Sequence, residues 1–198
     1  MCLLIETLKI ENKTLQNIDG HNFRFNQARK ALFGAKMPLN LTDFIDLNLV
    51  ADNGIYKCSV IYKANIQKIT ITAYAPKLIK SLQLVTCNTI EYAYKYHDRS
   101  LLNQLKNNAK ADDVLIVKNK EVTDLSYANI VFFTSNNKAF TPANPLLKGC
   151  MRSYLLAQRS IKERKITIAD LGLFNRAKPI NAMLNFEETP FIDLSLLT

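Results

Sequence analysis

Lys95 is the residue whose surroundings in the sequence most suggest covalent chemistry. It lies in the segment EYAYKYHDRS, between a strand-like and a helical stretch. A lysine amine becomes nucleophilic when burial and neighbouring groups lower the pKa of its ammonium form. Tyr94, Tyr96 and His97 could provide such surroundings. An exposed lysine in a lysine-rich chain is the simpler interpretation, and the segment alone does not exclude it.

Two later segments could bind charged groups. In EVTDLSYANIVFF, a buried Asp124 could pair with a cationic heterocycle nitrogen, although an aspartate at a strand end is more often a turn or cap residue. Asn129 in the same segment could simply complete a tight turn. In TPANPLLKGCMRSYLL, Gly149 precedes an amphipathic helix whose first N–H groups would attract an anion, or would be an ordinary helix start. Arg24, in HNFR, is either a phosphate partner or a solvated basic residue.

Strand-like and helical patterns alternate irregularly around these residues. Strand patterns cover 2–10, 55–62, 66–74, 81–87, 113–117, 121–123, 128–134, 138–141, 164–168 and 178–184. Helical patterns cover 22–33, 40–51, 100–111 and about 150–159, with a further short helix between the last two strands. We therefore expect an α+β chain with a small N-terminal α/β lobe over 1–80. A larger, barrel-like C-terminal lobe should follow over 86–198.

Composition restricts the partners. The 198 residues carry a formal net charge of +9, which could attract nucleic acid, but the basic residues are dispersed and form no known nucleic-acid-binding signature. We expect a small anionic ligand rather than nucleic acid. No apolar run approaches the ~20 residues needed to span a bilayer, and MCLLIE makes a poor signal peptide. Four scattered cysteines and two histidines predict free thiols, no metal site and a cytoplasmic location.

Taken in order, these segments resemble the class IV, pyridoxal-phosphate-dependent aminotransferases of fold type IV. LLIETLKIEN resembles the first strand of that family, and KYHDRSLLNQL its Schiff-base lysine segment. VTDLSYANIVFF is similar to its acidic–Asn strand, FTPANPLLKGCMRSYLL to its TP…GxxR loop, and PINAML to its C-terminal Asn-Ala segment. The resemblance covers nearly the whole chain and is strongest to short bacterial members grouped with aminodeoxychorismate lyase.

The resemblance implies a role for each matching residue. Lys95 would be the catalytic lysine that binds pyridoxal 5′-phosphate and moves protons. Asp124 and Asn129 would both bind the cofactor, and the carboxylate of Asp124 would face the pyridine nitrogen. The phosphate would be held by five residues, namely Arg24, Gly149, the backbone of Cys150 and Met151, and nearby Asn181. The family also implies a homodimer.

Three departures from the family affect the expected substrate more than the cofactor. Asp124 is shorter than the usual glutamate, and Cys150-Met151 replace a common threonine. A Gly- and Arg-rich substrate loop is absent after 55–62, so Lys57 is the cation expected to bind a substrate carboxylate, with Tyr94 lining the site; Lys57 could equally be an exposed strand residue.

The expected reaction is that of a lyase converting 4-amino-4-deoxychorismate to 4-aminobenzoate and pyruvate in folate biosynthesis. The alternatives are a branched-chain or D-amino-acid aminotransferase, with Ile55, Tyr56 and Tyr94 as apolar walls, or a non-catalytic protein that keeps the fold.

Overall fold

The structure, a computed structural model, describes residues 2–198 and divides them into two compact units. Unit 1 contains the described residues up to Pro76 together with Tyr94–Asp98. Unit 2 contains Lys77–Ala93 and Arg99–Thr198. The chain thus leaves unit 2 for five residues, around Lys95, and returns. Whether the two units are the functional lobes expected at 1–80 and 86–198 stays a prediction.

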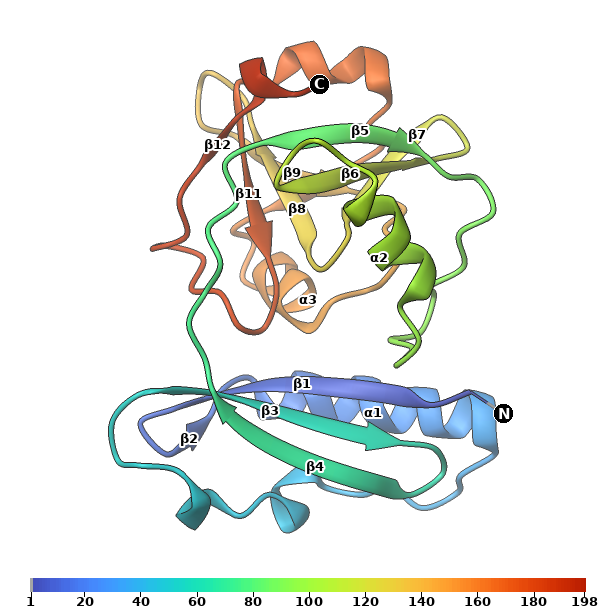
Figure 1. The fold of residues 1–198 in the computed structure, drawn as a ribbon, viewed down its shortest axis with the longest axis vertical. Coiled ribbons are helices and arrows are strands. Elements are labelled where there is room, and N and C mark those ends of the chain that lie inside the picture. The colour runs from blue at the N-terminus through green and yellow to red at the C-terminus, as the bar shows by residue number, and fades with distance from the viewer. Residues whose placement is uncertain (1) are drawn as a thin grey trace. The chain divides into compact units, whose positions relative to one another are not determined.

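Unit 1 is a four-stranded antiparallel sheet with one long helix along it (Figure 1). The strand order is β2-β1-β3-β4, and the elements are β1 (Leu4–Glu11), β2 (Thr14–Leu15), α1 (Ile18–Phe33), β3 (Ile55–Tyr62) and β4 (Ile66–Ala73). Cross-strand pairs such as Leu8–Cys58 and Leu4–Tyr62 place alternate apolar residues on one face. That face is buried, because all four side chains are at most 1% exposed. The period-2 pattern therefore positions both β1 and the helix packed against it.

The helix expected over 40–51 does not form. Two short 3-10 turns replace it, η1 (Leu41–Phe44) and η2 (Leu47–Leu49). Asn40 and Asp46 each accept a hydrogen bond from the backbone N–H two residues later, at 3.2 and 2.9 Å. Such local side-chain bonds compete with continuous helix, which explains the difference from the prediction.

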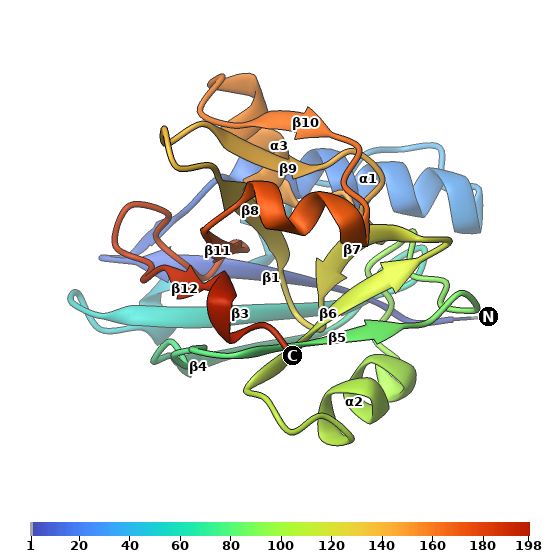
Figure 2. The same ribbon diagram turned by 90° about the horizontal axis from the view of Figure 1, so that it is seen from above.

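Unit 2 contains two sheets. One has the order β10-β9-β8-β11-β12 and the other β5-β6-β7. The bounds are β5 (Leu82–Thr86), α2 (Ser100–Asn107), β6 (Asp113–Lys118), β7 (Glu121–Leu125), β8 (Asn129–Phe133), β9 (Ala139–Pro142), α3 (Cys150–Ala157), β10 (Lys162–Arg164), η3 (Ile168–Leu173), β11 (Arg176–Ile180), β12 (Ile192–Asp193) and η4 (Leu194–Leu196). Figure 2 shows α2 beside β5 and β6, and α3 beside β9. A mixed fold of sheets with few helices is thereby confirmed, although neither sheet closes into a barrel within residues 2–198.

Two strand predictions near the C-terminus were misplaced. The strand expected at 164–168 ends at Arg164, because Thr167 and Asp170 form a capping box that starts η3. The strand expected at 178–184 ends at Ile180, where the Asn181 side chain accepts a hydrogen bond from Met183 N at 2.8 Å and turns the chain.

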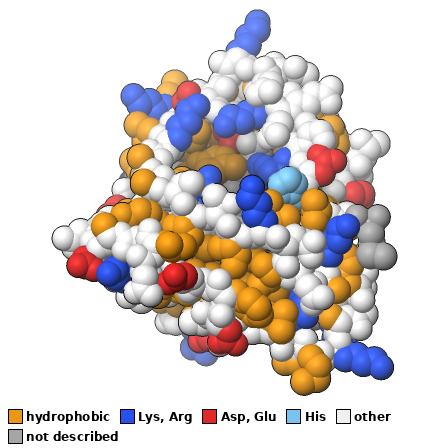
Figure 3. All heavy atoms as spheres, turned by 60° about the horizontal axis from the view of Figure 1, so that its bottom comes forward, with side chains coloured by type: hydrophobic (Ala, Val, Ile, Leu, Met, Phe, Trp, Pro, Cys, Tyr) orange, Lys and Arg blue, Asp and Glu red, His pale blue; other side chains and the backbone are white. Residues whose placement is uncertain are grey.

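The surface has apolar as well as polar regions. Figure 3 shows hydrophobic side chains on the face turned toward the viewer. Exposed apolar residues in unit 1 include Phe23, Met37, Phe44 and Leu49. Among residues 2–198, no helix has the length and apolar character of a membrane span.

Candidate active site

The carboxylate of Asp124 lies at the centre of a buried polar cluster in unit 2. Its Oδ1 accepts a hydrogen bond from Asn129 Nδ2 at 2.7 Å, and its Oδ2 accepts one from Leu147 N at 3.0 Å. Asn129 Nδ2 also donates to the Leu147 carbonyl at 2.8 Å. Asp124 is only 5% exposed and Asn129 6%. The turn between β7 and β8 therefore brings two of the predicted residues together and fixes both against the proline-containing loop.

Burial raises the pKa of Asp124 to about 6, against the opposing effects of the Asn129 and Leu147 hydrogen bonds and the charge of Arg152. A carboxylate in this setting lacks full compensation for its lost hydration. It would gain from an additional cationic N–H group, and a protonated ring nitrogen has that chemistry.

Gly149 is required by its close approach to Asn129. A Cβ built at Gly149 would overlap Asn129 Oδ1, so only glycine fits here without displacement of the amide. Gly149 is also the N-cap residue of α3, in extended conformation. Cys150, which is buried, and Met151, which is half-buried, begin the helix. The first N–H groups of α3 therefore start directly beside the Asp124–Asn129 pair.

Arg152, in the first turn of α3, holds that helix in place. Its Nη2 donates to the Pro142 carbonyl at 2.8 Å and to Glu163 Oε1 at 2.7 Å. The side chain is 3% exposed, and its Nε has no hydrogen-bond partner among residues 2–198. The arginine of the GxxR pattern thus supports the helix start.

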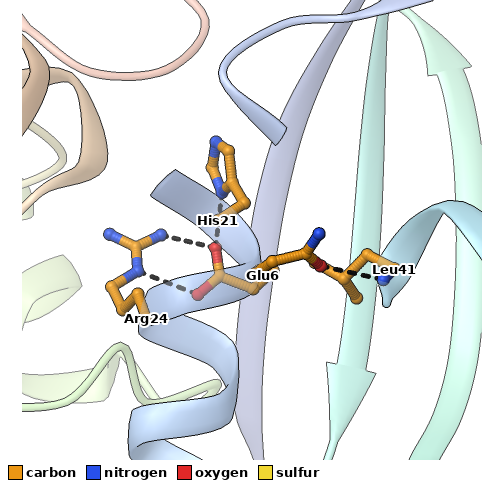
Figure 4. A network of polar contacts seen from close by, with 5 residues as sticks. Glu6, His21, Arg24 and Leu41 are labelled. Atoms are coloured by element: carbon orange, nitrogen blue, oxygen red, sulfur yellow. Dashed lines mark hydrogen bonds and ion pairs between the residues drawn. The ribbon is translucent and has the colours of Figure 1, made fainter. Parts of the chain in front are cut away.

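Arg24 on α1 belongs to a second buried network, in unit 1 (Figure 4). Its Nε and Nη2 donate to the two carboxylate oxygens of Glu6, at 2.8 and 2.6 Å. His21 Nδ1 lies 2.7 Å from Glu6 Oε2 and donates to it, since an ionised carboxylate only accepts. This two-point contact fixes the plane of the guanidinium and leaves its Nη1 edge directed away from Glu6.

Glu6 is a residue that the sequence reasoning missed. It is completely buried, which by itself would raise the pKa, but the charge of Arg24 and the hydrogen bonds from His21 and Arg24 outweigh burial and lower the pKa of Glu6 to about 2. The available signal was its position, because Glu6 interrupts the apolar series Leu4, Leu8, Ile10 on the core face of β1. A charge in such a series needs a buried partner.

Lys95 lies on a segment that extends the unit 1 sheet. Ile5 N donates to the Lys95 carbonyl at 3.0 Å, and His97 N donates to the Leu3 carbonyl at 2.9 Å. Lys95 is half-buried. Tyr94, also half-buried, packs edge-on to Tyr96 with 6.3 Å between ring centroids. The backbone of the lysine is therefore held by β-type hydrogen bonds on both sides.

Lys57 lies in the centre of β3, paired with Lys9 of β1 and Thr72 of β4. Lys57 is half-buried, whereas Lys9 is buried and donates to Glu11 Oε2 at 2.8 Å. Directly opposed residues share a face, so two lysines lie side by side there. The predicted residues thus divide between the units: Arg24, Lys57, Tyr94 and Lys95 in unit 1, and Asp124, Asn129, Gly149, Cys150, Met151 and Asn181 in unit 2.

These residues supply the donor set that pyridoxal phosphate needs. Unit 1 offers the primary amine of Lys95 and the guanidinium of Arg24. Unit 2 offers the buried Asp124 carboxylate, which could accept from a ring N–H, and the N–H groups at the start of α3, which suit a phosphate. Gly149 keeps the α3 start against Asn129 without a side chain between them. The chemistry of the two buried clusters therefore fits this cofactor.

Comparison with known proteins agrees with this chemistry. The model of the family described as amino-transferase class IV matches residues 3–186. The chain is 38% identical over 183 residues to an uncharacterized protein of Haemophilus influenzae, covering 91% of this chain and 97% of that one. A crystal structure of a protein from Haemophilus somnus, named a putative 4-amino-4-deoxychorismate lyase, is 30% identical with a TM-score of 0.86 and covers 92% and 97% of the two chains.

A protein from Mesorhizobium loti, named a putative amino-acid aminotransferase, shares the fold at 17% identity, with a TM-score of 0.78 over all of both chains. The chain described here therefore belongs to the class IV aminotransferase family. Membership of this family supports pyridoxal phosphate as the cofactor and an enzyme dependent on it.

Proposed function

We propose that this protein is a pyridoxal-phosphate-dependent lyase that converts 4-amino-4-deoxychorismate to 4-aminobenzoate and pyruvate. The observation that carries the cofactor part is the buried Asp124–Asn129–Gly149 cluster, in which burial of the carboxylate outweighs its hydrogen bonds and the charge of Arg152. The 30% identical structure named for the same lyase activity supports the reaction.

We assign some of these residues to binding the cofactor and one to moving protons. The Asp124 carboxylate accepts the ring N–H, and Asn129 with the Leu147 backbone holds that carboxylate in one orientation. Arg24, fixed by Glu6, and the first N–H groups of α3 neutralise the phosphate, with Asn181 nearby. When bound, the cofactor supplies a ring that withdraws electrons from the substrate's α-carbon. Lys95 Nζ takes the proton from that carbon and returns one later.

The substrate carboxylate is assigned to Lys57. Its neighbour Lys9 places a second cation on the same face of the sheet, partly neutralised by Glu11. Such a face would favour a substrate with more than one carboxylate. We assign the half-buried Tyr94 to the substrate ring. We further propose a cytoplasmic location, since Cys2, Cys58, Cys87 and Cys150 form no disulfide, as is usual in a reducing compartment. A role in folate biosynthesis follows from the proposed lyase reaction.

An amino-acid aminotransferase is the second candidate. Ile55 is half-buried on β3 and lies two residues before Lys57, so the two side chains share a face, and Ile55 could form an apolar wall beside a single cation for one carboxylate. Tyr56, which we expected in the same wall, packs on the core face instead. A substrate with a branched aliphatic side chain would suit that arrangement.

One pair of assays separates the candidates. Purified protein loaded with pyridoxal phosphate is incubated with 4-amino-4-deoxychorismate, and 4-aminobenzoate and pyruvate are both measured; a second sample receives branched-chain or D-amino acids with 2-oxoglutarate. We expect equal amounts of 4-aminobenzoate and pyruvate. Lys57→Gln should raise the KM by about tenfold, as expected for one lost charged hydrogen bond, while the exposed control Lys138→Gln should not. Glutamate without 4-aminobenzoate would favour the aminotransferase, and activity in neither assay would favour a non-catalytic protein.

A further inference from the structure

Arg99 joins the two ends of the segment that carries Lys95. The chain leaves unit 2 after Ala93 and returns at Arg99. Arg99 Nη1 donates to Tyr92 Oη over a long 3.4 Å, and the guanidinium carbon lies 6.0 Å from the Tyr92 ring centroid. Tyr92 is 7% exposed. The last buried side chain before the excursion thus contacts the first residue after it, and the contact closes the base of a short loop.

The same arginine also binds the turn between Asp124 and Asn129. Arg99 Nη2 donates to the Ser126 carbonyl at 2.7 Å. Ser126 is 4% exposed, and the turn is closed by a hydrogen bond from Leu125 N to Ala128 O at 2.9 Å. A charged donor on a buried carbonyl is among the stronger hydrogen bonds of a protein.

The turn that contains Ser126 also lies beside Asp113. Burial raises the pKa of the Asp113 carboxyl, and the polar groups of Ser126 beside it oppose this rise. Asp113 begins β6, the central strand of the three-stranded sheet. The turn is therefore buried beside the start of β6 and bound by Arg99, which makes it a well-ordered point of attachment.

We infer that Arg99 is a positioning residue for Lys95: it closes the base of the lysine segment and anchors that base to the turn that links Asp124 and Asn129. This inference rests on the proposed function, in which the lysine and the carboxylate act on one cofactor. Arginine suits the role because its rigid, planar fork can reach two acceptors at once, whereas lysine offers a single flexible ammonium group.

The first test uses the cofactor-free protein. Amide hydrogen exchange is measured for His97 N–H and Ile5 N–H, which report the docking of the lysine segment on β1. Arg99→Met should accelerate their exchange by about fivefold or more, as expected for a lost charged hydrogen bond. Arg99→Lys should lie between Arg99→Met and wild type, and Tyr92→Phe should have the smallest effect because the Arg99–Tyr92 hydrogen bond is long, at 3.4 Å.

Lys106→Met is the matched control. Lys106 lies on α2, the helix whose N-cap residue is Arg99, and its Nζ is 5.9 Å from the ring centroid of Tyr127 in the turn that Arg99 binds. Its substitution removes a positive charge near the turn without touching the base of the lysine segment, so exchange at His97 and Ile5 should stay at the wild-type rate.

The second test uses protein incubated with pyridoxal phosphate. Arg99→Met should bind about as much cofactor as wild type but should form the borohydride-reducible link to Lys95 at least about fivefold more slowly, with an altered visible spectrum. Arg99→Lys should recover part of the rate. Arg99 variants indistinguishable from Lys106→Met in both tests would overturn the inference. If Arg99→Met does not fold, Arg99→Lys and Tyr92→Phe decide.

Measurements on the wild-type protein distinguish a failure of the proposed function from a failure of the role inferred for Arg99. A wild type without a reducible link at Lys95 would contradict the proposed function and, with it, the positioning role toward a cofactor. A wild type that forms the link, with variants that form it equally fast, would contradict the role of Arg99 alone.

Discussion

Gly149 shows how little freedom the residues of the site have. Because a Cβ at this position would overlap Asn129 Oδ1, Gly149→Ala must displace the amide that holds Asp124. We expect the free energy of unfolding to fall by about 1–3 kcal/mol, the usual cost of overpacking, and turnover to fall more than cofactor occupancy. Urea unfolding and cofactor titration check this. Gly172→Ala, with no atoms within 4 Å of its Cβ, should behave as wild type, and equal effects of the two substitutions would contradict the account.

Glu6 makes stability depend on acid pH. Its folded pKa of about 2 lies below the ordinary value of 4.5, so its contribution is present above pH 4.5 and is lost as the pH falls through the folded pKa. The shift corresponds to roughly 3 kcal/mol. Glu6→Gln should lower stability at pH 7 and flatten the loss between pH 4.5 and 2, measured by urea unfolding across that range. The exposed Glu188→Gln is the control, and parallel curves for Glu6→Gln and wild type would exclude the buried ion pair.

For single residues, the sequence indicated which residues belong to the candidate site better than it indicated which side chains they contact. The resemblance indicated Asp124, Asn129 and Gly149, and the structure brings these three together. The roles of Lys95 and Arg24 toward a cofactor stay predictions. The Glu6–Arg24 contact joins residues 18 positions apart on a strand and a helix, so no local pattern could predict that Arg24 is already paired.

The C-terminal end of α1 is stabilised by the backbone conformation of a single glycine. Gly34 takes the left-handed conformation, with φ 65°, and its N–H donates to the Lys30 carbonyl at 3.2 Å. Its Cβ position is open, so Gly34→Ala changes conformational strain alone. We expect a loss of about 1 kcal/mol in the free energy of unfolding. Thermal or urea unfolding measures it, with exposed Lys36→Ala as the control; an unchanged stability would show that α1 does not depend on this cap.

The elements were predicted well where a single period persists. The hairpin at 55–62 and 66–74 forms as expected, since its β-rich runs flank a short turn. Prediction failed where side chains bind the adjacent backbone, as at Asn40 and Asp46, or where a capping box ends a strand, as at Thr167. Those local hydrogen bonds outweigh propensity and are not visible in hydropathy.

For the whole molecule, contacts between residues that are distant in sequence decide which unit a segment belongs to. Tyr94–Asp98 belongs to unit 1 although its neighbours on both sides belong to unit 2. The segment belongs to unit 1 because its backbone is hydrogen-bonded to Leu3 and Ile5. Backbone hydrogen bonds of this kind cannot be predicted from the pattern of side chains in the sequence. The sequence therefore predicted a lysine segment without predicting where it docks.

We predict that the protein is a homodimer, as the family resemblance implies and as two-fold association commonly provides. Exposed apolar residues such as Phe23, Met37 and Leu49 are consistent with surface that a second copy could cover. Light scattering at micromolar concentration should give twice the 22.5 kDa chain mass. A monomer mass, unchanged by pyridoxal phosphate, would contradict the prediction.

The central claim is that this chain carries pyridoxal phosphate on Lys95, and reductive trapping tests it most directly. Protein incubated with pyridoxal phosphate is reduced with borohydride, digested and analysed by mass spectrometry, alongside Lys95→Ala and a control, Lys118→Ala, in which the lost lysine contacts Ile90 O and Glu91. We predict one phosphopyridoxyl group on Lys95 in wild type and in Lys118→Ala, and none in Lys95→Ala. A group on another lysine, or none in the wild type, would contradict the account.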